Sequence, residues 1–80
     1  MATLANVKKA LGITDSYQDD TLQVYFDEVV DFLTSAGVAR DNITDGIVAL
    51  GITDLWNYGS GDAKFSAAFI MRATQLSYKN

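Results

Sequence analysis

The chain has 80 residues, a net charge of −4, and neither Cys nor His. The missing Cys and His exclude thiolate and imidazole zinc sites, cysteine nucleophiles and histidine acid–base catalysis. A chain of this length is expected to fold as one domain, residues 1–80, and to bury only about 60% of the surface of its unfolded form. Because the chain has no Cys, disulfides cannot stabilise so small a core, and we expect contacts with further subunits to stabilise it instead.

The charges are distributed unevenly. Residues 63–80 contain basic side chains and no acid, whereas residues 10–39 contain no base and these acids: Asp15, Asp19, Asp20, Asp27, Glu28 and Asp31. The two charged regions are either solvated faces or complementary contacts between subunits. The net negative charge argues against nucleic-acid binding, and no apolar run approaches the roughly 20 residues that span a bilayer. We therefore expect no membrane partner.

The first predicted helix is "TLANVKKAL", in which the apolar residues follow helical spacing. Thr3 is expected to cap its start. Gly12, followed by Ile13, is typical of a left-handed glycine that ends a helix with an apolar residue folded back on it.

A second, longer helix is expected to begin at Asp19 and Asp20, whose carboxylates are placed to cap free backbone N–H groups. Gly37 is the expected C-terminal glycine. The predicted buried stripe comprises Leu22, Tyr25 or Phe26, Val29, Phe32 and Leu33. The opposite face carries acidic residues for which this helix supplies no Lys or Arg: Asp27, Glu28 and Asp31.

The hexapeptide "ALGITD" ends the first helix at residues 10–15 and recurs at residues 49–54. The second copy lies within a predicted helical stripe of Ile43, Ile47, Leu50, Gly51, Leu55 and Tyr58. A continuous helix through Gly51 requires a compensating tertiary contact, most simply a close helix crossing. The alternative is a break at Gly51, with Thr53 or Asp54 capping a new helix.

A final helix is expected after the glycine-rich stretch "YGSGD", with Ser66 as its cap and Phe65 folded back on it. Phe69, Ala73 and Leu76 form its predicted buried stripe, which Ile70, Met71 and Tyr78 are expected to widen. The fold class is therefore all-α, a small bundle of about four helices.

No catalytic, cofactor or metal site is expected. Asp15, Asp19 and Asp20 lack the alternating oxygens, central Gly and closing Glu of a calcium loop, and helix capping explains them better. Trp56, Tyr58 and Phe65 flank the glycine-rich stretch and are either a partner surface or packing between the last two helices.

The order of elements resembles the head-tail connector family of long-tailed bacteriophages. The similarity is carried by the opening "VKKALGI", the acidic pair and long helix of "DDTLQVYFDEVVDFL", the aromatic end of "IVALGITDLWNYG", and the closing "FSAAFIMRATQLS". The chain departs from the family in having no Pro before the third helix and no Arg-Gly after Gln75-Leu76.

The resemblance implies a ring-forming structural subunit of the virion neck, made in the host bacterial cytoplasm, with no enzymatic activity. Such a ring lies beneath the portal protein, extends the DNA channel without sequence-specific binding, and meets the next neck or tail protein. The candidate channel or subunit contacts are Asp27, Glu28, Asp31, Lys64 and Arg72. The alternative is a small helical binding module or regulator that docks one partner through the region of Trp56 and Phe65.

Overall fold

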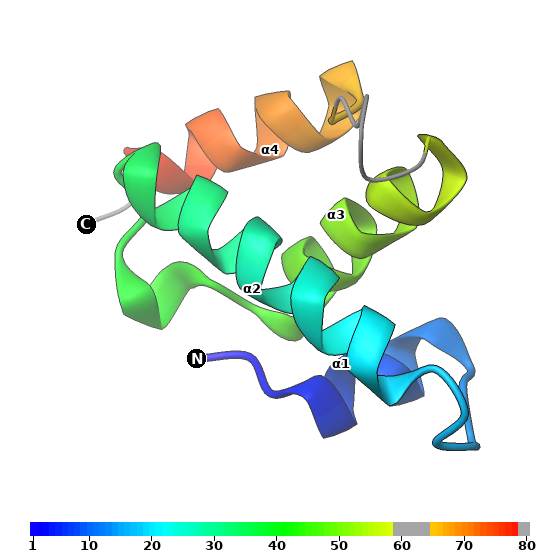
Figure 1. The fold of residues 1–80 in the computed structure, drawn as a ribbon. Coiled ribbons are helices and arrows are strands. Elements are labelled where there is room, and N and C mark those ends of the chain that lie inside the picture. The colour runs from blue at the N-terminus through cyan, green and yellow to red at the C-terminus, as the bar shows by residue number, and fades with distance from the viewer. Residues whose placement is uncertain (59–64, 79–80) are drawn as a thin grey trace.

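The computed structural model of the chain describes residues 1–58 and 65–78, which contain four α helices and one 3-10 turn and no strand (Figure 1). The elements are α1 (Leu4–Leu11), α2 (Asp19–Ser35), η1 (Arg40–Asn42), α3 (Asp45–Tyr58) and α4 (Ala67–Ser77). Helix α3 packs against each of the other three helices. In Figure 1, α1 and α4 lie at opposite ends of the bundle, with α2 and α3 between them. The expectation of a small all-α bundle is confirmed.

Both ends of α1 follow the sequence prediction. The Thr3 side chain accepts a hydrogen bond from the backbone N–H of Asn6, 3.2 Å away. Gly12 adopts φ 76°, and the N–H of Ile13 donates to the carbonyl of Lys8 at 2.9 Å. The first "ALGITD" therefore ends a helix through a left-handed glycine.

The segment before α1 is tied to the start of α3. The N–H of Ala2 donates to the carbonyl of Ile43 at 3.0 Å, and the N–H of Thr3 donates to Oδ1 of Asp45 at 3.2 Å. Ala2 is buried. Thr3 and Asp45 are 42 positions apart, so these bonds join segments that are distant in the sequence.

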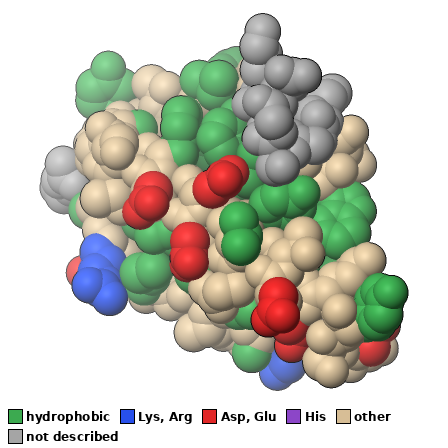
Figure 2. Space-filling model, in the orientation of Figure 1, with side chains coloured by type: hydrophobic (Ala, Val, Ile, Leu, Met, Phe, Trp, Pro, Cys, Tyr) green, Lys and Arg blue, Asp and Glu red, His purple; other side chains and the backbone are tan. Residues whose placement is uncertain are grey.

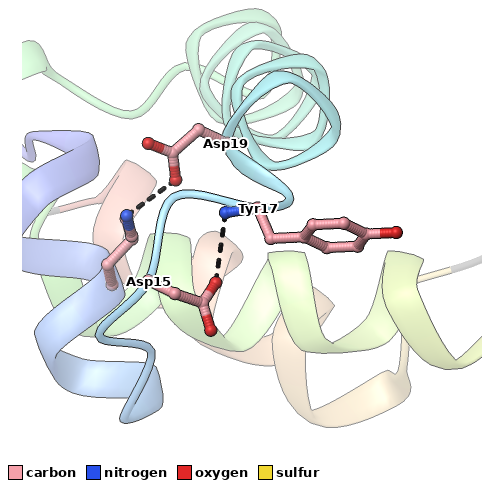
Figure 3. Close-up of polar contacts among 4 residues, drawn as sticks. Asp15, Tyr17 and Asp19 are labelled. Atoms are coloured by element: carbon pink, nitrogen blue, oxygen red, sulfur yellow. Dashed lines mark hydrogen bonds and ion pairs between the residues drawn. The ribbon is translucent and has the colours of Figure 1, made fainter.

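The prediction that Asp19 caps α2 is wrong, although α2 does begin there. Oδ1 of Asp19 instead lies 2.6 Å from Nζ of Lys8 and forms an ion pair between α1 and α2 (Figure 3). Asp15 is not a cap either, since its Oδ1 accepts from the N–H of Tyr17 in the preceding turn, at 3.2 Å. A charged donor in reach binds a carboxylate more strongly than a neutral backbone N–H does. Asp19 and Asp20 remain in the first turn, where carboxylates face the positive end of the helix dipole.

The inner face of α2 is the predicted one. Leu22, Phe26, Val29 and Leu33 are buried, and Tyr25 and Phe32 are partly buried beside them. Beyond the end of the helix, Gly37 has φ 89°, and the N–H of Val38 donates to the carbonyl of Leu33 at 3.0 Å. The expected C-terminal glycine is confirmed.

Helix α3 runs without a break through Gly51, so the predicted continuity is confirmed and the alternative break is wrong. A Cβ at position 51 would lie 2.7 Å from Cε1 of Phe69 and 2.8 and 2.9 Å from the two Cγ atoms of Val29. Two helices, α2 and α4, therefore cross α3 at a residue without a side chain. The prediction that Leu50 lies in the buried stripe is wrong, because Leu50 is 37% exposed. The helices that pack against α3 cover the sides on which Val48 and Ile52 lie instead.

Helix α4 begins as predicted, with Oγ of Ser66 accepting from the N–H of Phe69 at 3.2 Å. Its buried residues are Phe69, Ala73 and Leu76, as expected. The widening of this stripe is wrong, because Ile70, Met71 and Tyr78 are exposed. Since α4 lies at one end of the bundle, only one of its faces is covered by the described residues (Figure 1).

Gly51→Ala is expected to lower the free energy of unfolding by about 1–3 kcal/mol, because its methyl group overpacks the crossing against Phe69 and Val29. Denaturant unfolding followed by circular dichroism measures this loss. Gly46→Ala is the matched control in the same helix. A Cβ there meets only Oγ1 of Thr44, at 4.0 Å, so a gain of about 0.5 kcal/mol is expected. Equal stability of the two variants would contradict the crossing.

Gly12→Ala tests the other copy of the hexapeptide. A Cβ at Gly12 meets nothing within 4 Å, so any loss comes from the backbone conformation alone. The left-handed φ predicts a loss of about 1–2 kcal/mol in the same unfolding measurement. A neutral effect would show that residue 12 readily leaves the left-handed region.

Candidate functional site

The outer face of α2 carries the acidic residues predicted as channel or subunit contacts. Asp27, Glu28 and Asp31 are exposed, and the only hydrogen bond that their side chains make within the described residues joins Gln23 Nε2 to Asp27 Oδ1, at 2.9 Å. In the part of the chain that the structure describes, the ion pair of Lys8 with Asp19 is the only one. Figure 2 shows acidic side chains spread along the face on which α2 lies. This face is therefore a row of carboxylates without cationic partners in the described part of the subunit.

Arg72 is the basic candidate that the structure describes, and it lies on α4 and not on the acidic face of α2. It is exposed on α4, where its Nη1 donates to Oε1 of Gln75 at 3.4 Å. It also lines a surface hollow of about 300 Å³, whose lining comes from α4 and the start of α3: Thr44, Gly46, Ile47, Leu50 and Arg72. We call this depression the α3–α4 hollow. Lys64, the other basic candidate, lies outside the described residues. The structure thus places Arg72 away from the acidic face of its own subunit.

The candidate partner surface separates into two aromatic clusters. Trp56, which is 43% exposed, meets Tyr25 edge-on with ring centroids 5.8 Å apart. Phe65 stacks on Phe69 at 4.4 Å and lies 4.7 Å from Phe32. Tyr25 and Phe32 are seven residues apart on α2, or about 10 Å along its axis. Tyr58 ends α3, and its side chain lies outside the described part of the structure.

A small apolar pocket adjoins Trp56. Its volume is about 170 Å³, and it is lined by residues of α1, α2 and α3 and by the turn after α1: Leu11, Ile13, Leu22, Ile52, Thr53, Trp56 and Asn57. Drug-sized ligands and cofactors occupy about 300–1,000 Å³. The pocket is therefore smaller than the site of a drug-sized ligand or a cofactor.

Sequence reasoning missed a buried carboxylate, that of Asp54, which is only 7% exposed. Its Oδ2 accepts from both the N–H and the Oγ–H of Ser66, at 2.9 and 2.8 Å. Because Ser66 caps α4, this pair of bonds fixes the start of α4 on α3. The available signal was that Asp54 follows Ile47 and Leu50 at helical spacing, which places an acid in an apolar stripe.

The described residues contain no group of three or more acidic side chains that could hold a metal ion. None of their helices is long and apolar enough to cross a membrane. The candidate sites among the described residues are surfaces, namely the acidic face of α2, Arg72 beside the α3–α4 hollow, and the half-exposed Trp56.

Comparison with known families gives these surfaces a context. The family model described as phage gp6-like head-tail connector protein matches residues 1–65, a range that includes α1, α2, η1 and α3. The chain belongs to the gp6-like head-tail connector family. This connector family consists of structural phage proteins that join head and tail, and it places the chain among virion components. Helix α4 lies after the matched range. No curated protein and no solved structure gave a significant match to the chain.

Asp54→Ala is expected to lower the free energy of unfolding by about 2–3 kcal/mol, because it removes two hydrogen bonds to a buried carboxylate and leaves Ser66 without its acceptor. Chemical denaturation measures the loss. Asp54→Asn keeps one carbonyl oxygen as acceptor and should lose less. Asp15→Ala, at the same position of the other hexapeptide, removes one exposed bond and should cost no more than about 1 kcal/mol. Similar losses at positions 15 and 54 would contradict the anchoring role of Asp54.

Proposed function

We propose that the chain is the subunit of a ring that lies beneath the portal protein, completes the head and extends the DNA channel toward the tail. The match of residues 1–65 to the head-tail connector family carries this proposal. The ring contacts the portal on one side and the next neck or tail protein on the other. The chain contributes surfaces to this assembly and catalyses no reaction.

The physical properties of the chain support a role in assembly. Its core is thin, and neither disulfides nor thiolate or imidazole metal sites can strengthen it. Contacts with neighbouring subunits would add the missing buried surface. The net charge of −4 also suits a channel component, because DNA passes a negatively charged wall without sticking to it.

A second candidate function is a helical binding module that docks one partner. The half-exposed Trp56 beside its small apolar pocket favours it, since exposed aromatic residues are common anchors of protein interfaces. The two functions differ in partner and stoichiometry. A connector assembles with copies of itself and with the portal, whereas a binding module takes up one partner.

Concentration-dependent self-association of the isolated protein is the first expected outcome. Analytical ultracentrifugation over a wide concentration range should show weak oligomers. Pull-down with the portal protein of the same phage should recover the chain, and cryo-electron microscopy of the virion neck should show it as a ring. A single monomeric species that also fails to bind the portal would contradict the connector proposal.

Trp56 is the only tryptophan of the chain, so its fluorescence separates the two functions. If a partner binds at Trp56, burial of the half-exposed ring shifts its emission to shorter wavelength. The connector proposal predicts that self-association proceeds in a Trp56→Phe variant, which keeps an aromatic ring beside Tyr25. Loss of one-partner binding in that variant, with no self-association of the wild type, would favour the binding module.

A further inference from the structure

The α3–α4 hollow has the features of a receptor for an acidic, partly apolar surface. Leu50 is 37% exposed at its edge, Ile47 is buried beneath it, and Gly46 adds no side chain. Arg72 lines the same hollow, and no carboxylate of the described residues pairs with its guanidinium. An apolar contact and an unpaired cation are thus available at one place.

The outer face of α2 has the matching features. Val24 is 54% exposed. Its neighbours on the helix surface, at i−4, i+3 and i+4, are all carboxylates, namely Asp20, Asp27 and Glu28. Figure 2 shows hydrophobic side chains among the acidic ones on this face. Val24 is therefore an exposed apolar residue with carboxylates at neighbouring positions of the helix surface, so a partner surface would need both an apolar and a cationic group.

These two surfaces belong to different sides of the subunit. Helix α2 turns Val29 toward α3 at the Gly51 crossing. Asp31 is two residues further, about 200° around the helix, and so faces away from α3. The hollow is lined by α3 and α4 without any residue of α2. The acidic face of one subunit can therefore meet the hollow of another copy and not its own.

We propose that the outer face of α2 docks into the α3–α4 hollow of the neighbouring subunit, with Val24 against Leu50 and with Asp27 and Asp31 toward Arg72. This inference rests on the proposed connector function and names the subunit contact. Opposite charges orient the two faces before the apolar groups touch. Because two different patches meet, the contact is heterologous, and each bound pair leaves one face and one hollow free for the next copies.

Two single substitutions test the contact, since each disables one half of it. Val24→Lys brings a cation into a hollow that already contains Arg72, and Leu50→Gln replaces the apolar side chain that would meet Val24 with an uncharged polar one. Both positions are exposed on helices, so folding should be retained, as circular dichroism would verify. Each variant alone is expected to self-associate at least ~10-fold more weakly than the wild type in sedimentation. Met71→Lys is the matched control, because Met71 is an exposed apolar residue of α4 outside the hollow, and it should associate normally.

An equimolar mixture of the two variants gives the decisive result. The intact α2 face of the Leu50→Gln chain can dock in the intact hollow of the Val24→Lys chain, whereas the second contact of that pair combines both substitutions. The mixture is therefore expected to form a one-to-one heterodimer and nothing larger. Combining Arg72→Glu with Asp31→Arg in one chain should restore association that either change alone weakens.

The outcomes separate this contact from the connector function. If the Val24→Lys and Leu50→Gln variants associate as well as the wild type, alone or on the portal, the proposed contact is wrong and the connector function is unaffected. A mixture that stays monomeric would overturn the contact as well. If the substitutions change only DNA retention in particles, the α2 face lines the channel instead. Wild-type protein that assembles neither alone nor on the portal contradicts the connector ring itself.

Discussion

The close crossing at Gly51 is the constraint on which the rest of the structure depends. Val29 of α2 and Phe69 of α4 meet α3 within 2.7–2.9 Å of the point where any other residue would carry a Cβ. Val29 lies in the middle of the buried stripe of α2, and Phe69 is the first buried residue of α4, so the crossing fixes where each stripe meets α3. The two residues next to Gly51 differ in their surroundings. Ile52 is buried, whereas Leu50 is exposed and lines the α3–α4 hollow.

Polar contacts fix the ends of the helices around this crossing. Lys8 and Asp19 join α1 to the start of α2, and Ser66 and Asp54 join the start of α4 to α3. A thin core specifies helix directions weakly, because few apolar contacts distinguish one arrangement from another. A charged or buried hydrogen bond is satisfied only in one arrangement, so it adds the missing specificity. The two copies of "ALGITD" show the difference, since Asp15 closes an exposed local turn and Asp54 holds two helices together.

Local chemistry made much of this fold predictable from the sequence. The caps at Thr3, Gly12 and Ser66 and the stripe on α2 depend on residues within one or two turns, and the structure has all of them. The roles of Asp19 and Asp54 could not be predicted, because their partners are distant in the sequence. Lys8 lies 11 positions before Asp19, and Ser66 lies 12 positions after Asp54. The acidic face of α2 could be predicted as a surface, but its relation to Arg72 required the placement of α4 on α3.

The charges of this surface affect an isolated subunit little and an assembly strongly. In water, exposed carboxylates on one helix face repel one another weakly, so a monomer tolerates them. Buried between two subunits, the same carboxylates need cationic or hydrogen-bonding partners. Two α2 faces therefore cannot pair with each other, which disfavours a symmetric dimer through this helix. Contact with a different, cationic surface satisfies the charges, and a contact between unlike patches propagates from subunit to subunit. In the proposed ring, the acidic face would therefore add little stability to the subunit but would disfavour closed pairs, and a ring of identical subunits requires that closed pairs be disfavoured.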